Sequence, residues 1–211
     1  MARTTPGETR QRILDEAIRL FASRGYDATS VVDIQVACGL TRGSGALYKH
    51  FPSKKALLEH AVTRNVETLA RKHAEAVAEL PADPREALKL LADVVWTVMD
   101  SERDLIRIMI REFGGFPELF ERMWQGVLAH LYRVCGEWIA GLCERGEAEV
   151  ADPDATAAVL LASLTYYPIL DTLIGHTPGD TDPERFLAAW FDHAAAALRL
   201  DQSNSTPGGP R

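Results

Sequence analysis

Cysteine is scarce in this sequence, and its spacing excludes two kinds of structural site. The 211 residues include three cysteines, Cys38, Cys135 and Cys143. They are too few and too irregularly spaced for a disulfide framework, and the sequence contains neither a CxxC pair nor a Cys/His cluster. We therefore expect thiols that stay reduced, and neither a metal nor a cofactor.

Inspection of the sequence also finds no long apolar run. The first 25 residues contain no apolar segment of the kind that a signal peptide needs. No apolar run approaches the roughly 20 residues that span a bilayer. The sequence predicts a cytoplasmic protein without a membrane partner.

Motifs for catalysis are absent as well. The sequence has no HExxH, no P-loop and no dinucleotide glycine fingerprint. The Gly43-Ser44-Gly45 run has neither the flanking residues nor the preceding strand of a phosphate cradle or nucleophile turn. We therefore expect no enzymatic activity.

The charge of the chain is unevenly distributed. The net charge is −7, yet residues 1–60 carry nine Lys or Arg against six Asp or Glu, a net of +3, so the remainder carries −10. A basic segment joined to an acidic body suggests that one surface meets a polyanion and the rest does not.

Helical patterns dominate the N-terminal part. Apolar residues recur at three- and four-residue spacing between Ile13 and Phe21, which predicts a helix that ends at Gly25. Ser30 and Asp33 form the pattern of a capping box for a second helix over 30–38. Further helices are predicted over 41–50 and from residue 53 onward.

Three Asp-Pro pairs mark later helix starts. Asp83-Pro84, Asp152-Pro153 and Asp182-Pro183 each place a capping carboxylate before a proline at the first helical position. With helices over 105–112 and 117–146, this predicts an all-α protein of about nine helices. We expect an N-terminal helical domain over 1–52, a larger helical domain over 53–201 that shares the fourth helix, and a disordered tail over 202–211.

The second and third predicted helices form a helix-turn-helix. They are joined by the short turn Gly39-Leu40, and the second member of such a pair is the one that enters a major groove. Its polar side chains are donors, whereas Leu47 and Phe51 are expected to face the core. Such a pair can also be two packed helices with no DNA role.

Residues 9–58 resemble the DNA-binding domain of the TetR family of bacterial transcriptional repressors. The densest similarity is the run GALYKHFPSKKALL over 45–58, and TSVVDI over 29–34 adds to it. One departure is the segment between Leu40 and Tyr48, which is two residues longer than the commonest family spacing.

The resemblance implies roles for nine DNA-binding residues. Tyr48 and Lys54 correspond to phosphate contacts, and Thr29 and Ser30 lie at a helix N-terminus that favours a phosphate. The remaining candidates lie along the predicted recognition helix, with Arg42 suited to a bidentate contact with guanine: Thr41, Arg42, Ser44, Lys49 and His50.

The resemblance also implies a ligand-binding and dimerisation domain in the rest of the chain. Soft and aromatic side chains suit an adaptable pocket for a small apolar effector, although such residues are often plain core; the candidates are Trp96, Met99, Met109, Phe113, Trp124 and Tyr166. The candidate dimer-interface residues are Leu160, Leu164, Phe186, Trp190, Ala194 and Ala197.

Together these features predict a ligand-responsive repressor. A homodimer would bind a near-palindromic operator in double-stranded DNA, and a small, mostly apolar effector would release it. The alternative is a helical protein that binds a hydrophobic ligand and has no DNA activity.

Overall fold

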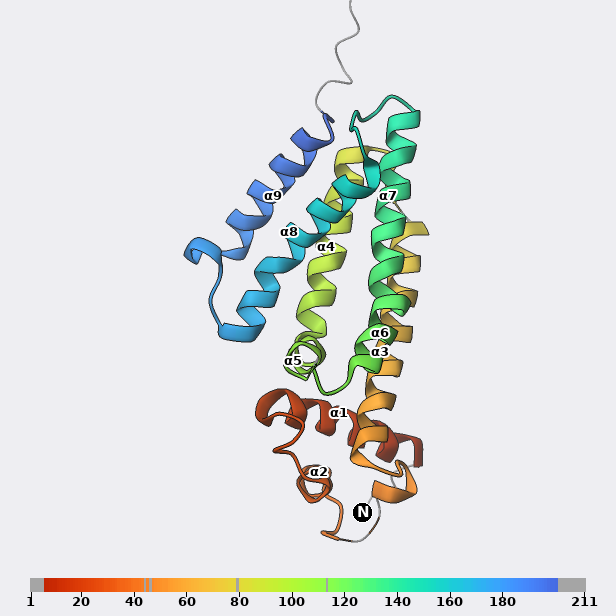
Figure 1. Cartoon of the computed structure of the whole chain (residues 1–211), viewed down its shortest axis with the longest axis vertical. Helices are drawn as coiled ribbons and strands as arrows, with labels where there is room; N and C mark the ends of the chain where they lie inside the picture. The colour runs from red at the N-terminus through yellow and green to blue at the C-terminus, as the bar shows by residue number, and fades with distance from the viewer. Residues whose placement is uncertain (1–5, 44, 46, 79, 113, 201–211) are drawn as a thin grey trace, which may run out of the picture. The chain divides into compact units, whose positions relative to one another are not determined.

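The computed structural model describes residues 6–43, 45, 47–78, 80–112 and 114–200. Every regular element in these ranges is helical, which confirms the predicted all-α class (Figure 1). The α-helices are α1 Pro6–Arg24, α2 Val31–Ala37, α3 Lys54–Ala78, α4 Pro84–Ser101, α5 Arg103–Arg111, α6 Pro117–Met123, α7 Ala129–Glu144, α8 Pro153–Ile174 and α9 Pro183–Ala197. Two 3-10 turns, η1 Leu47–Lys49 and η3 Pro178–Asp180, and a π-turn, η2 Trp124–Leu128, complete the set.

The chain forms two compact units. The first comprises Met1–Leu69 and Glu102–Gly126, and the second comprises Ala70–Ser101 and Val127–Arg211. The sequence predicts a single boundary after residue 52, whereas the structure also groups α5 and α6 with the N-terminal segment. The reason is that α5 packs against α1, and its own residues Leu105 and Ile108 are thereby almost completely buried.

The first unit has a core built around α1. Ile13, Leu14 and Phe21 of this helix are fully enclosed, and Leu57 of α3 is enclosed as well. Helix α1 ends where Gly25 adopts a φ of 93°, a left-handed conformation that glycine reaches without a steric penalty. This core holds α2 and the segment that follows it.

The predicted helix over 41–50 is wrong in its extent. Among the described residues of this segment, only the three-residue turn η1 is helical. Gly43 and Gly45 have φ values of 69° and 65°, and a left-handed conformation cannot continue a right-handed helix. Leu47 and Phe51 are nevertheless fully buried, as the sequence predicts.

The predicted helix over 117–146 is divided. It consists of α6, the π-turn η2 and α7. The glycine in this π-turn is closely packed, because a Cβ placed on Gly126 would lie 2.5 Å from Cγ1 of Val66. Within the described part of the chain the number of α-helices agrees with the prediction, because the helix predicted over 41–50 is missing and the one predicted over 117–146 is divided into α6 and α7.

The second unit contains α4 and α7 to α9, and its helix starts confirm the Asp-Pro prediction. The carboxylate of Asp83 accepts a hydrogen bond from the Glu86 amide at 2.9 Å. Asp152 and Asp182 cap α8 and α9 in the same way. The tail predicted to be disordered, 202–211, lies outside the described residues.

Candidate DNA-binding site

Helix α2 is fixed at its start by the predicted capping box. The Asp33 amide donates to Oγ of Ser30 at 3.1 Å, and the Ser30 amide donates to the Asp33 carboxylate at 2.9 Å. The hydroxyl of Ser30 also donates to that carboxylate, and these hydrogen bonds lower the pKa of Asp33. Ser30 thus lies at an exposed helix N-terminus, but its side chain already has a partner.

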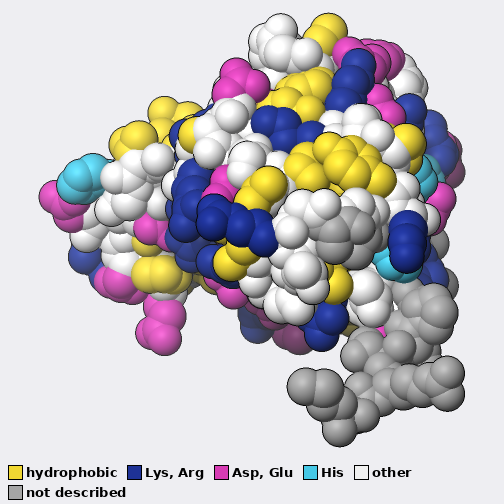
Figure 2. Space-filling model, turned by 90° about the horizontal axis from the view of Figure 1, so that it is seen from below, with side chains coloured by type: hydrophobic (Ala, Val, Ile, Leu, Met, Phe, Trp, Pro, Cys, Tyr) yellow, Lys and Arg dark blue, Asp and Glu magenta, His cyan; other side chains and the backbone are white. Residues whose placement is uncertain are grey.

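Several candidate DNA-contacting side chains are exposed around η1. Tyr48 is 55% exposed, Lys49, Thr41 and Arg42 are exposed, and His50 is half-buried. Ser44, also predicted to contact DNA, lies outside the described residues. Figure 2 looks onto the face that carries α1 and α2, where Lys and Arg side chains occur in several groups among neutral and acidic ones.

The Thr29 side chain cannot contact DNA in this conformation. It is fully buried, and its hydroxyl donates to the Gly25 carbonyl at 2.8 Å and lies 3.3 Å from the Leu20 carbonyl. The hydroxyl therefore closes the C-terminal end of α1. Sequence reasoning placed Thr29 at a helix terminus but could not see that it faces the preceding helix.

Lys54 also makes internal contacts. Its ammonium donates to the carbonyls of Tyr26 at 2.8 Å and Thr29 at 3.1 Å, and it lies 4.1 Å from the centroid of the Tyr26 ring. Burial raises the pKa of the Tyr26 phenol, so the ring stays neutral. The geometry favours Lys54 as a link between α3 and the turn that follows α1.

Sequence reasoning missed a further anchor at the same turn. The Tyr26 amide donates to Oε1 of Glu112 at 3.0 Å, and Arg111 donates to the Ala22 carbonyl at 3.2 Å. Both partners come from the end of α5, more than 80 residues away in sequence. No local pattern could have indicated this contact.

The candidate effector residues do not form one cluster within either unit. Met109 and Trp124 belong to the first unit, whereas Trp96, Met99 and Tyr166 belong to the second. Phe113, also predicted, lies outside the described residues.

Two of these candidates, Trp96 and Tyr166, have different surroundings in the second unit. Trp96 stacks on Tyr167 with ring centroids 5.2 Å apart, and its indole donates to the Leu164 carbonyl at 3.1 Å. Tyr166 points away from this core and is exposed. A role for Tyr166 inside a pocket of this unit is therefore not supported.

The apolar interior of the second unit contains a small cavity. It measures about 40 Å³, and only apolar atoms are exposed in it. The lining includes Leu88, Val95, Leu131, Cys135 and Trp138. Pockets for drug-sized ligands occupy about 300–1,000 Å³, so an effector of that size requires this interior to expand.

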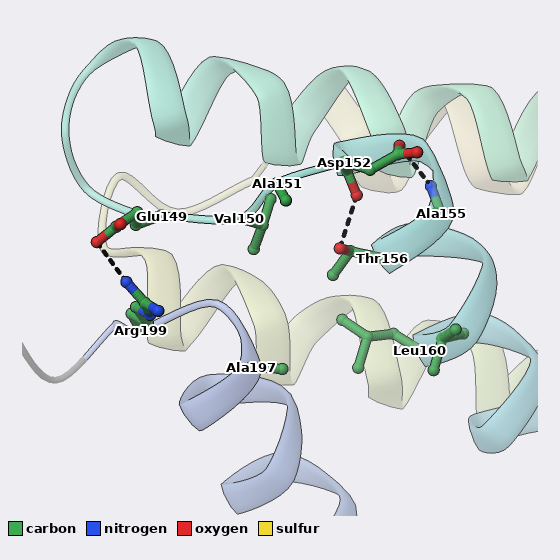
Figure 3. A pocket seen from close by; sticks show the side chains of 10 residues that line it. Glu149, Val150, Ala151, Asp152, Ala155, Thr156, Leu160, Ala197 and Arg199 are labelled. Carbon is green, nitrogen blue, oxygen red and sulfur yellow. Dashed lines mark hydrogen bonds and ion pairs between the residues drawn. The ribbon is translucent and has the colours of Figure 1, made fainter.

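A larger groove at the start of α8 is open to solvent. It measures about 490 Å³. Figure 3 shows the side chains that line it. Its polar groups bind one another, since Arg199 lies 2.6 Å from the Glu149 carboxylate and Thr156 donates to the Asp152 carbonyl at 2.7 Å. None of the candidate effector residues lines this groove.

Comparison with known families assigns both parts of the chain. The family model described as "Bacterial regulatory proteins, tetR family" matches residues 13–61. The model described as "AefR-like transcriptional repressor, C-terminal domain" matches residues 86–200, which is more than half of the chain. The chain belongs to the TetR family.

Individual TetR-family proteins are similar over part or all of the chain. The regulator AcrR of Shigella flexneri is 37% identical over 107 residues, which are 49% of each chain. The repressor KstR2 of Rhodococcus jostii is 34% identical over 131 residues, 56% of this chain and 63% of the relative. This chain thus spans less than two thirds of the length of either relative.

A solved structure extends the similarity of fold to nearly the whole chain. The fatty acid degradation regulator FadR from Bacillus halodurans matches with a TM-score of 0.71 and 18% identity, over 94% of this chain and 99% of its own. At that identity, the likeness concerns the TetR fold alone.

Half of the candidate dimer-interface residues lie in the core of the second unit rather than on its surface. Leu164, Trp190 and Ala194 are buried in the core of the second unit, so they cannot meet another subunit in this conformation. Phe186 is half-buried and packs on the same core. Leu160 is half-buried and Ala197 is exposed, and both line the open groove of Figure 3.

Proposed function

We propose that this TetR-family chain binds a DNA operator in a sequence-specific way through the segment 41–50. The observation that carries the proposal is the arrangement of this segment. Buried Leu47 and Phe51 fix it to the core, while Arg42, Tyr48 and Lys49 remain exposed. Arg42 reads base edges, and Tyr48 and Lys49 contact phosphates.

Ser30, Thr41 and His50 complete the proposed DNA-contacting set. Ser30 is included because it is exposed at the N-terminus of α2, where the helix dipole favours a phosphate, even though the capping box occupies its amide and hydroxyl. Thr29 is left out because its side chain is enclosed, and Lys54 because its ammonium already serves two carbonyls.

We propose that the chain acts as a cytoplasmic homodimer through α8 and α9. Among the described residues, α8 is the one helix that is long and apolar enough to cross a bilayer, contrary to the inspection of the sequence. Only 28% of its most apolar window is buried within the chain, so most of this window is exposed. Val159, Tyr166 and Ile174 are exposed along it. A second copy of the chain would cover this face, and a two-fold dimer would suit a palindromic operator.

We propose that the chain is a repressor released by a small apolar effector. The name of the Rhodococcus relative, a repressor, supports the direction of regulation. The apolar cavity beside Val95 and Trp138 supports an apolar effector that enters the interior of the second unit. We further propose that the chain has no enzymatic activity and does not bind a membrane.

Selection of bound duplexes from random DNA by the full chain tests the central proposal. We expect a near-palindromic consensus, with half-sites about 34–36 Å apart or a multiple of that distance. Recovery of unrelated sequences would refute operator binding. It would favour the alternative of a helical protein that binds a hydrophobic ligand and does not act on DNA.

A further inference from the structure

One buried polar side chain holds the turn that precedes η1. Gln35 lies on α2 and is 2% exposed. Its side-chain oxygen Oε1 accepts a hydrogen bond from the Gly43 amide at 3.1 Å. Its backbone carbonyl accepts another from the Leu40 amide at 2.8 Å. A single residue therefore binds the turn at two points, three residues apart.

A buried glutamine is an unusual choice for this position. Burying an amide side chain costs free energy unless its polar atoms find partners, and the neighbouring core position on α2 holds the apolar Ile34. The turn after α2 supplies a partner for the side-chain oxygen of Gln35, namely the Gly43 amide. This turn is two residues longer than the commonest TetR spacing, and Gly43 is in a left-handed conformation with open space around its Cα.

The hydrogen bond to Gly43 also orients the preceding residue. The amide of Gly43 belongs to the planar peptide group that it shares with the carbonyl of Arg42. Fixing this N–H therefore fixes the plane from which the exposed Arg42 side chain departs. A longer turn without such a contact would leave Arg42 free to sample many directions.

We propose that Gln35 is a positioning residue for base readout, and that it acts by holding the Gly43 amide and so the direction of Arg42. This rests on the proposed operator binding. Gln35 itself touches no DNA, so its effect should fall on specific rather than non-specific affinity.

The test compares Gln35→Met with the unchanged chain. Methionine is of similar length and accepts hydrogen bonds only weakly, so the Gly43 amide loses its partner. We expect the Kd for the selected operator to rise about tenfold, which corresponds to about 1.4 kcal/mol. The Kd for a scrambled duplex should stay within about twofold, and the salt dependence should not change.

Two further variants separate positioning from a loss of folding. Ile34→Val removes a buried methylene beside Gln35 without touching the turn, so it should lower stability and leave operator affinity unchanged. Gln35→Asn keeps an amide but is one methylene too short to reach Gly43, so it should reproduce the loss seen for Gln35→Met.

Base-by-base selection gives the decisive readout. Gln35→Met should relax preference at the same base pair of each half-site that Arg42→Ala relaxes. If the unchanged chain selects no consensus, operator binding fails and the inference fails with it. If the unchanged chain selects a consensus and Gln35→Met returns the same profile and Kd, the inference alone is overturned.

Discussion

Replacing Lys54 by methionine should weaken the fold of the first unit rather than its attraction to DNA. Two charge-assisted hydrogen bonds to carbonyls contribute about 1.5–3 kcal/mol each, and a partly exposed cation over an aromatic ring adds about 0.5–1 kcal/mol. Ordering the lysine side chain costs about 2 kcal/mol, and water replaces part of the hydrogen bonding in the variant. Because Lys54 is partly exposed, the low end of these ranges applies, and the net loss is about 2 kcal/mol.

Hydrogen exchange at single amides measures this loss locally, which matters because a chain with two units need not unfold in one step. The Thr29 amide donates to the Tyr26 carbonyl at 3.2 Å and the Ile34 amide to the Ser30 carbonyl at 3.3 Å. A loss of about 2 kcal/mol should lower the protection of both amides about 30-fold.

The salt dependence of DNA binding supplies the opposing test. A lysine that contacts a phosphate contributes about 0.9 to the slope of log K against log salt, whereas an internal lysine contributes nothing. Lys54→Met should therefore keep the slope, and Lys49→Met, which removes an exposed cation from η1, should reduce it by about 0.9 per contact. Unchanged amide protection together with a reduced slope for Lys54→Met would refute the internal role.

Three other predictions concern capping, thiol reactivity and assembly. The pKa of Asp33 is lowered by its hydrogen bonds with Ser30, so the ionised carboxylate stabilises the fold above the unfolded pKa of about 3.9, and this stabilisation is lost as the pH falls through the folded pKa. Asp33→Asn should therefore lower the melting temperature at pH 7 and leave it unchanged at a pH below the folded pKa. Burial raises the pKa of Cys135 to about 11, so iodoacetamide at pH 8 should label half-buried Cys143 first by mass spectrometry, and equal rates would contradict this assignment. Val159→Glu, at a site 67% exposed on α8, should shift the chain from dimer to monomer in light scattering; an unchanged mass would argue against the α8 face.

Features set by neighbouring residues could be predicted from the sequence. The cap of α2 by Ser30 and the starts of α4, α8 and α9 after Asp83, Asp152 and Asp182 depend on atoms within three residues, and the structure has all of them. The inward orientation of Leu47 follows from a similarly local pattern.

Features set by distant contacts could not be predicted. Thr29 is enclosed by the end of α1, and Glu112 reaches Tyr26 from another part of the chain, so neither position shows in a local pattern. Gly43 and Gly45 are different, because glycine disfavours a helix interior and both residues are visible in the sequence of the segment 41–50. This local preference argues against the uninterrupted helix predicted over 41–50 and agrees with the left-handed conformation of both glycines.

The division of the chain has a practical consequence for anyone who wishes to cut or recombine it. The backbone passes between the two units at three places, after Leu69, Ser101 and Gly126. A fragment that stops at the first crossing would lack α5 and α6 and would leave the apolar surface of α1 uncovered. A chimaera that exchanges a whole unit therefore needs three junctions, because a single splice after Leu69 would separate α1 from the α5 that packs against it.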